Sequence, residues 1–223
     1  MGTGLPFTRF LFPQAECVLC LAYTGDEVLC RGCTQQLASF AGEQVWSNQA
    51  LDKRCSRGNL AILAFWPYAW PLSAVQQRCK FGGWRLGGRM LAHLAAQLCA
   101  ASPELDLTDC VVVPAPMHWT RRVRRGGNHA SLQGDALARA LSLPCAPHWL
   151  KRTQARPQQM GLPRRQRLKN LKGSFVASNA VQGRRVLLFD DIVTTGSTMR
   201  YMAEALYAQR AEQVIGISLM RVD

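Results

Sequence analysis

Two adjacent carboxylates followed by a hydroxyl-rich turn are the residues of this sequence whose types and spacing best suit ligand chemistry. Asp190 and Asp191 come directly after the mostly apolar residues 185–189, which we expect to form a strand. The turn after them contains Thr194, Thr195, Gly196, Ser197 and Thr198. Ligands of open α/β sheets bind beyond the carboxyl ends of strands, and free N–H groups at a helix N-terminus suit a phosphate. The carboxylates can then accept hydrogen bonds from neighbouring hydroxyls of a sugar that carries the phosphate, with an ordinary capped turn as the alternative.

Four of the nine cysteines have the spacing of metal ligands. Cys17 and Cys20 form one Cys-x-x-Cys pair, and Cys30 and Cys33 form a second. Two such pairs complete a closed tetrahedral site of four thiolates, which suits a structural Zn2+ ion. A thioredoxin-like redox pair is the alternative, but it needs a βαβ context that two closely spaced pairs do not fit. We therefore predict a small zinc-binding module near the N-terminus.

The composition and charge of the chain favour a globular protein that binds polyanions. Its 223 residues are 48% hydrophobic and 18% charged, which excludes wholesale disorder. There are 27 Lys and Arg against 14 Asp and Glu, a net charge of +13. Residues 117–189 hold fifteen of these basic residues and a single acid, Asp135, so this segment alone carries +14. Such a local excess favours binding of phosphate ligands or nucleic acid, with a solvated basic face as the alternative.

No targeting signal or transmembrane segment is expected. Residues 1–14 lack a basic stretch followed by a long apolar core, which a secretion signal requires. The longest uncharged apolar run, residues 60–75, is interrupted by Pro67 and Pro71 and is too short and broken to span a bilayer. We therefore expect a cytoplasmic protein.

The hydrophobic pattern predicts an α/β fold. Residues 34–58 are expected to form a helix and a polar linker. The expected strands are residues 60–68, 110–113, 148–150, 173–177, 185–189 and 213–220. The expected helices run from residue 71 to about 81, over 86–100, over about 129–142, and from the hydroxyl-rich turn to about residue 209. This order implies a mostly parallel sheet with helices on both faces.

The chain divides into two parts in this interpretation. Residues 1–58 form the zinc module and its linker. Residues 59–223 form the α/β domain, with a smaller N-terminal portion at 59–102 and a core at 103–223. Residues 152–171 are polar and basic, which predicts a long loop, and long loops inside compact domains are usually functional.

Several motifs resemble those of a known family. Residues 186–198, with the acidic pair and the turn, resemble the 5-phosphoribosyl-1-diphosphate (PRPP) motif of type I phosphoribosyltransferases. Residues 113–128 run from Val-Pro-Ala-Pro through an arginine cluster to Asn128, and they resemble the central signature of ComF-type competence proteins and their GntX-like relatives. Arg152, Arg167 and residues 170–173 of the basic loop share this resemblance. An N-terminal zinc ribbon is also typical of that family.

The resemblance implies a type I phosphoribosyltransferase-like domain that binds PRPP with Mg2+. Asp190 and Asp191 would be the catalytic residues at the ribose, and residues 194–198 would hold its phosphate. The diphosphate would contact Pro114, Ala115, Pro116, Arg121, Arg122, Arg124, Arg125, Arg152 and Arg167. Guanidinium groups stabilise the charge that develops on a leaving diphosphate. Closure of the loop 152–171 would exclude the water that hydrolyses PRPP.

Two positions keep alternative roles. Trp119, next to His118, either stacks on a nucleic-acid base or packs beneath the loop. Lys80 stands where relatives also carry Lys-Phe, and it either contacts the second substrate or closes a hood over the site.

Two functions are compatible with these motifs. One is transfer of the ribosyl phosphate of PRPP to an unidentified acceptor. The other is binding of single-stranded DNA during DNA uptake, with a competence helicase or other DNA-uptake proteins as candidate partners. We favour a phosphoribosyltransferase-fold protein that acts in competence-type DNA uptake. A PRPP sensor or nucleic-acid-binding protein without turnover is the alternative.

Overall fold

The computed structural model contains both helices and strands, and it describes residues 17, 19–20, 22–24, 30–42, 51–70, 72–81, 85–100, 102, 105–117, 127–153 and 173–222. The helices are α2 (Arg31–Gly42), α3 (Leu72–Phe81), α4 (Arg85–Ala100), α6 (His129–Ala140) and α8 (Ser197–Ala208). The strands are β1 (Leu51–Cys55), β2 (Gly58–Pro67), β3 (Cys110–Pro114), β4 (Leu150–Arg152), β5 (Phe175–Ala177), β6 (Arg185–Val193) and β7 (Gln213–Arg221). Within these described ranges no helix has the length and apolar character needed to cross a membrane.

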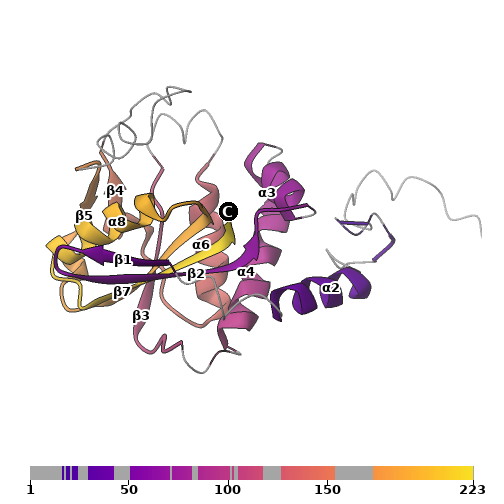
Figure 1. Ribbon diagram of the computed structural model, residues 1–223, viewed down its shortest axis with the longest axis horizontal. Coiled ribbons are helices and arrows are strands. Elements are labelled where there is room, and N and C mark those ends of the chain that lie inside the picture. Colours follow the sequence, from indigo (N-terminus) through magenta and orange to yellow (C-terminus); the bar gives the residue numbers. More distant parts are fainter. Residues whose placement is uncertain are drawn as a thin grey trace, which may run out of the picture.

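A five-stranded sheet in the order β1-β2-β7-β6-β3 forms the centre of the fold (Figure 1). β2, β7, β6 and β3 pair in parallel, whereas β1 at the edge runs antiparallel to β2. The parallel strands are nearly continuous apolar runs because both of their faces are covered, and all five residues of β3 are buried. The predicted α/β fold with a mostly parallel sheet is confirmed.

Alternate residues of each strand face opposite layers of the fold. α3, α4 and α6 pack on one face of the sheet, in a buried cluster that includes Phe189 of β6. α8 and the antiparallel pair β4–β5 pack on the other face, in a cluster that includes Leu188. Because side chains alternate along a strand with period two, Asp190 belongs to the α8 side of the sheet and Asp191 to the α3 side.

The polar linker predicted to end at residue 58 is wrong in its last part. Residues 51–55 form β1, which pairs with β2 as a hairpin. An edge strand tolerates charged side chains, so its composition resembles that of a linker. Several hydrogen bonds tie the hairpin to α8. Among them, the Ser56 hydroxyl donates to Glu204 at 2.8 Å, and the Tyr207 hydroxyl donates to the Asn59 carbonyl at 2.6 Å. The division of the chain between residues 58 and 59 stays a prediction.

The strand predicted at residues 148–150 begins later than expected. Pro147–Trp149 forms a short 3-10 helix, and proline favours such a first turn because it lacks an N–H. The strand β4 follows at Leu150–Arg152 and pairs with β5. Arg152, expected at the start of the basic loop, therefore lies on a strand. The remaining loop residues, 154–171, lie outside the described part of the chain.

Candidate functional site

A cleft lies at the carboxyl ends of β3 and β6, where open α/β sheets bind ligands. Its walls come from α3, α6, α8, β4 and β5 and from residues 115–117 after β3. Lys80, Asp190 and Asp191 line it, together with Thr198 of the predicted phosphate-binding turn. The structure thus brings the acidic pair, Thr198 of the turn and the segment after β3 to one place, and their roles in ligand binding stay predictions.

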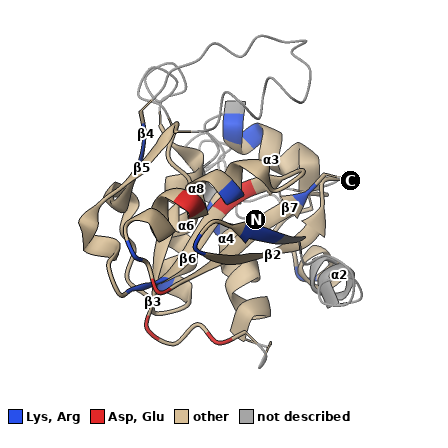
Figure 2. Ribbon diagram, turned by 60° about the vertical axis from the view of Figure 1, so that its left-hand side comes forward, with Lys and Arg blue, Asp and Glu red and all other residues tan. Residues whose placement is uncertain are grey.

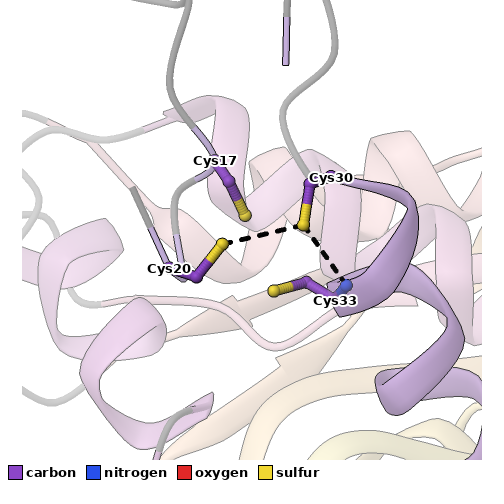
Figure 3. A group of neighbouring side chains, drawn as sticks. All are labelled: Cys17, Cys20, Cys30 and Cys33. Atoms are coloured by element: carbon purple, nitrogen blue, oxygen red, sulfur yellow. Dashed lines mark hydrogen bonds between the residues drawn. The ribbon is translucent and has the colours of Figure 1, made fainter. Parts of the chain in front are cut away.

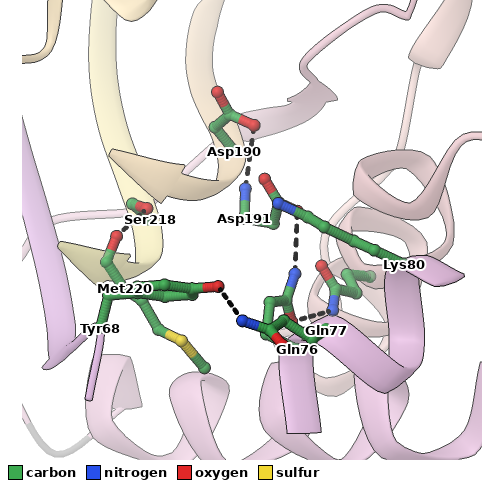
Figure 4. Close-up of polar contacts among 9 residues, drawn as sticks. Tyr68, Gln76, Gln77, Lys80, Asp190, Asp191, Ser218 and Met220 are labelled. Carbon is green, nitrogen blue, oxygen red and sulfur yellow. Dashed lines mark hydrogen bonds and ion pairs between the residues drawn. The ribbon is translucent and has the colours of Figure 1, made fainter. Parts of the chain in front are cut away.

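The two carboxylates of the acidic pair point in different directions (Figure 4). Asp190 accepts a hydrogen bond from the backbone N–H of Asp191 at 2.9 Å. Burial and the neighbouring Asp191 raise the pKa of Asp190 well above its usual value. Asp191 is 9% exposed and contacts α3, where Lys80 Nζ lies 2.8 Å from Asp191 Oδ2 and Gln76 Nε2 donates to the same oxygen at 2.8 Å. Asp190 is therefore the carboxyl group left for a ligand, and the sugar-binding role expected for both residues stays a prediction.

The turn between β6 and α8 has a backbone that requires glycine. Gly196 has φ = 71°, and a Cβ there would lie 2.8 Å from Ile62 Cδ1. The first N–H groups of α8, from Ser197 onward, have no acceptors one turn earlier in the helix. Thr194 and Thr195 are exposed, and the hydroxyls of Thr195 and Ser197 lie 2.8 Å apart. The turn therefore offers N–H and hydroxyl donors beside the cleft.

Lys53 lies against this turn, although the sequence placed it in a linker. A Cβ on Gly196 would lie 3.0 Å from Lys53 Cε. Lys53 and the buried Cys55 occupy alternate positions on β1 and so face α8 together. Among the described residues the ammonium group of Lys53 has no ion-pair partner. Had residues 51–55 been recognised as a strand, their alternation would have placed Lys53 on the same side as α8.

The segment after β3 and the start of α6 form another wall of the cleft. The Ala115 N–H donates to the Phe189 carbonyl at 2.7 Å, and Asn128 Nδ2 donates to the Ala115 carbonyl at 3.1 Å. Gly134 lets α6 approach β3, because a Cβ there would lie 2.8 Å from Pro114 Cγ. The first residues of both α6 and α8 thus line one cleft, which suits a ligand with two anionic groups.

Arg152, which we predicted to bind the diphosphate, lines the cleft, and this binding role stays a prediction. Its guanidinium carbon lies 5.6 Å from the ring centre of Phe175, and both residues line the cleft. The other predicted residues of this group are Arg121, Arg122, Arg124, Arg125 and Arg167. They lie outside the described residues, as do His118 and Trp119, so their roles stay predictions.

A chain of two buried hydrogen bonds, from Gln133 to Gln76 and from Gln76 to Asp191, was not predicted from the sequence. Gln133 Nε2 on α6 donates to Gln76 Oε1 on α3 at 3.0 Å, and both side chains are almost completely buried. Gly88 on α4 makes room for this contact, because a Cβ there would lie 2.9 Å from Gln133 Nε2. Gln76 and Lys80 are four residues apart and share a helix face, and this spacing was the available signal.

The four predicted metal ligands converge on one point (Figure 3). The sulfur atoms of Cys17, Cys20, Cys30 and Cys33 all lie within 4.8 Å of one another. The Cys20 and Cys30 sulfurs are 3.6 Å apart, close to the roughly 3.8 Å edge of a tetrahedron with Zn–S bonds of about 2.3 Å. Burial and the neighbouring thiols raise the pKa of Cys33, and a bound cation would favour the ionised form of this thiol. The cysteine set therefore fits a bound metal ion.

This cysteine cluster is attached to the core of the α/β domain. Cys17 is fully buried and belongs to the same apolar cluster as Phe65 and Trp66 of β2. Leu72 and Cys79 of α3 belong to that cluster as well. The module thus packs on the side of the sheet that also carries α3 and Asp191.

Comparison with known proteins identifies relatives of this chain. Residues 134–222 match the family described as phosphoribosyl transferase domain. Competence protein F of Haemophilus influenzae is 32% identical, over 91% of this chain and 95% of its own length. DNA utilization protein YhgH of Escherichia coli K12 is 37% identical over 66% of each chain. Competence protein ComFC of Bacillus subtilis is 24% identical, over 92% of this chain and 77% of its own length.

These matches, the sheet order and the four-cysteine cluster define a phosphoribosyltransferase-type domain with an N-terminal four-cysteine cluster. The chain belongs to the ComF family, as the motifs around residues 113–128 and 186–198 predicted. The predicted fold class and family are therefore confirmed.

Proposed function

We propose that the cleft binds PRPP together with Mg2+. The observation that carries this proposal is the convergence of two helix N-termini and the carboxyl group of Asp190 on one cleft. PRPP has two anionic ends, a 5-phosphate and a diphosphate, joined by a ribose with neighbouring hydroxyls. The turn 194–198 suits the 5-phosphate, and residues 115–117 with the start of α6 suit the diphosphate. Asp190 lines the same cleft and suits the ribose hydroxyls.

Arg152 lines the cleft, and its positive charge would attract the diphosphate end. A guanidinium group binds phosphate oxygens in pairs and stabilises the charge that develops when a diphosphate leaves. Mg2+ binds through oxygen ligands and water, so the oxygens of the diphosphate would carry it and Mg2+ would neutralise their charge.

The reaction that this site supports is transfer of the ribosyl phosphate. The bond between ribose C1 and the diphosphate oxygen breaks, a nucleophile of the acceptor forms a bond to C1, and the diphosphate leaves. The acceptor is unidentified in this proposal. The alternative is a PRPP sensor that binds in the same cleft without turnover, because a phosphoribosyltransferase fold does not by itself establish catalysis.

Calorimetric titration of the metal-loaded full chain with PRPP, with and without Mg2+, tests the proposal. We expect Mg2+-dependent binding that the double substitution Asp190→Asn and Asp191→Asn weakens at least about tenfold. Asp135→Asn is the matched control, since this exposed carboxylate on α6 pairs with Arg139 on the surface. Absence of PRPP binding, or unchanged binding by the double variant, contradicts the proposal.

A role in DNA uptake, with direct binding of single-stranded DNA, is the second part of the proposed function. The competence and DNA-utilization names of the relatives and the +14 segment at residues 117–189 support it. Figure 2 shows Lys and Arg on β4 and at the end of α3, where Lys80 and Arg152 line the cleft. A cytoplasmic location and a competence helicase or other DNA-uptake protein as partner belong to the same proposal.

Fluorescence anisotropy with a labelled single-stranded oligonucleotide at increasing salt tests this part. Counterion release predicts that the affinity falls steeply with salt concentration. Replacing Arg121, Arg122, Arg124 and Arg125 by glutamine should lower both the affinity and the salt dependence. A flat salt response, or no change in the glutamine variant, contradicts direct DNA binding and leaves the PRPP proposal unaffected.

The metal at the four-cysteine cluster is zinc in this proposal. A site of four thiolates without an open position suits structural Zn2+ better than the harder cations. Cys17, Cys20, Cys30 and Cys33 would hold the ion. Its contribution would be to fold the module, since a closed site leaves no position for a substrate.

A further inference from the structure

We propose that Lys80 positions the acidic pair: it holds the Asp191 carboxylate against α3 and cancels its charge, so that Asp190 alone faces a ligand in the cleft. This inference rests on the proposed function of the cleft as a site for a phosphorylated sugar. Lys80 extends from the last turn of α3, and its Nζ lies 2.8 Å from Asp191 Oδ2 (Figure 4). Lys80 acts through the carboxylates in this proposal, which is a role distinct from contact with a second substrate.

The charge of the acidic pair is the reason that such a residue is needed. Two carboxylates beside the anionic groups of PRPP would repel the ligand. The side chain of Lys80 is 22% exposed and that of Asp191 is 12% exposed, so water screens this ion pair only in part. With Asp191 neutralised, the pair presents at most one negative charge, that of Asp190.

Other titratable groups also lie near the acidic pair. Among the described residues, His129 on α6 and Arg152 on β4 also line the cleft. Cys79 lies beside Lys80 on α3, and burial together with Asp191 raises its pKa to about 11, so it stays neutral. The ion pair between Lys80 and Asp191 is formed in the structure, with Lys80 Nζ 2.8 Å from Asp191 Oδ2.

The side-chain amides of Gln76 and Gln133 are both oriented to satisfy the Asp191 carboxylate. An ionised carboxylate only accepts hydrogen bonds, so Gln76 must turn its Nε2 to Asp191 and its Oε1 to Gln133. Gln133 must then present its own Nε2, which leaves its Oε1 buried without a partner in the described part of the chain. An unpaired buried oxygen costs stability. This cost is the consequence of directing both amides toward one carboxylate.

The arrangement has a consequence for Asp190. Burial and Asp191 raise the pKa of Asp190, and the charge of Lys80 counteracts part of this rise. Removing the ammonium group therefore leaves Asp191 uncompensated and makes Asp190 harder to ionise. A purely structural role for Lys80 would change the stability of α3 without moving the titration of Asp190.

The test compares Lys80→Met and Lys80→Arg with the wild-type full chain in its metal-loaded form. Arg78→Met is the matched control, because Arg78 is an exposed cation in the same turn of α3. The double variant Lys80→Met with Asp191→Asn removes both charges and keeps the test valid where Lys80→Met folds poorly. Two measurements are made on each variant: a carbon-13 NMR titration of the Asp190 carboxyl without ligand, and calorimetric titration with PRPP and Mg2+.

We expect Lys80→Met to raise the pH at which Asp190 titrates and to weaken PRPP binding about tenfold at neutral pH. Lys80→Arg should keep the wild-type titration of Asp190 and the wild-type PRPP affinity, and Arg78→Met should change neither. Adding Asp191→Asn to Lys80→Met should recover PRPP binding. An unchanged Asp190 titration in Lys80→Met overturns the inference. An unchanged titration overturns the inference even if Lys80→Met loses PRPP binding, because Lys80 would then act by contacting the ligand directly. If Lys80→Met shifts the titration of Asp190 but the wild-type protein does not bind PRPP, the positioning role is supported and only the proposed function is overturned.

Discussion

The four-cysteine cluster and the strand-end cleft are assembled from the chain in opposite ways. The four thiols come from residues 17–33, share one residue type and form their site within one small module. The cleft collects different groups from α3, α6, α8, β4 and β6, which lie far apart in the sequence. Residue spacing therefore suffices to predict the first site, whereas the second depends on which strands are neighbours.

The two sites also differ in how they affect stability. A metal ion bound by the cysteines stabilises the folded chain, because the unfolded chain has no preformed site. The cleft and the residues behind it contain features that cost stability, namely the raised pKa of Asp190 and the unpaired Gln133 oxygen. This contrast gives four predictions.

Loss of the metal is expected to have the largest effect, and it acts on stability. Cys17 belongs to the same buried cluster as Phe65 and Trp66, so unfolding of the module exposes part of the domain core. We expect Cys30→Ser, or treatment with a strong chelator, to lower Tm by about 10 °C, which corresponds to roughly 4 kcal/mol in a chain of this length. Thermal unfolding measures the change in Tm, and a zinc assay on the same samples measures how much metal is bound.

Cys145→Ser is the matched control for the metal prediction. Cys145 is also partly buried, but it lies outside the four-cysteine cluster. It should retain the metal and a Tm close to that of the wild type. An equal Tm with and without chelator would show that the cluster does not support the core, and the contrast between the two sites would fail.

The turn beside the cleft is the next most sensitive position. Gly196 and Gly183 both have left-handed φ values, 71° and 65°, but only Gly196 is packed, since a Cβ there would lie 2.8 Å from Ile62 Cδ1. Gly183→Ala should cost about 1 kcal/mol through backbone strain alone. Gly196→Ala should cost about 1–3 kcal/mol more through overpacking and should weaken PRPP binding. Denaturant unfolding of both variants checks this, and equal losses would contradict it.

Asp190 should destabilise the folded protein at neutral pH. Its pKa is raised in the folded state, so the folded protein holds this proton more tightly than the unfolded chain, and stability falls as pH rises toward the raised pKa. Asp190→Asn cannot ionise and should therefore raise Tm above that pH by about 2 °C or more, the change produced by roughly 1 kcal/mol. The gain should vanish below about pH 4, where both states are protonated.

Asp106 should affect stability in the opposite direction to Asp190, because its pKa is lowered in the folded state. Hydrogen bonds from Thr108 and the Arg185 guanidinium lower the pKa of Asp106 to about 2. Its ionised form therefore adds stability above the unfolded pKa, and that stability is lost as pH falls through the folded pKa. Asp106→Asn should lower Tm at neutral pH. Thermal unfolding between pH 3 and 8 should give opposite shifts for the two variants, and shifts of the same sign would refute the assignment.

The sequence predicted what was encoded locally and missed what depends on pairing partners. The Cys-x-x-Cys spacing, the acidic pair and most helices were found because ligand spacing and hydrophobic periodicity are local properties. β1 was missed because an edge strand tolerates the charges of Lys53 and Arg54. The partners of Asp191 were missed because α3 meets β6 only through the topology of the sheet.

Lys53 gives the smallest expected effect and connects the missed strand to the cleft. Its stem lies against the turn at Gly196, so its charge should favour a phosphate at the start of α8. We expect Lys53→Met to weaken PRPP binding about two- to fivefold at low salt, since exposed charges near a helix terminus contribute about 0.3–1 kcal/mol. The difference should shrink as salt screens the charge.

Arg54→Met separates a local contact from general attraction. Arg54 is exposed and adjacent on β1, so side-chain alternation directs it away from α8. Calorimetry at two salt concentrations should show a loss for Lys53→Met and almost none for Arg54→Met. Equal losses would assign the effect to the overall positive charge. A loss specific to Lys53 would mean that the edge hairpin, which spacing alone did not predict, supplies a group to the ligand site, so the cleft depends on sheet topology even at its phosphate-binding end.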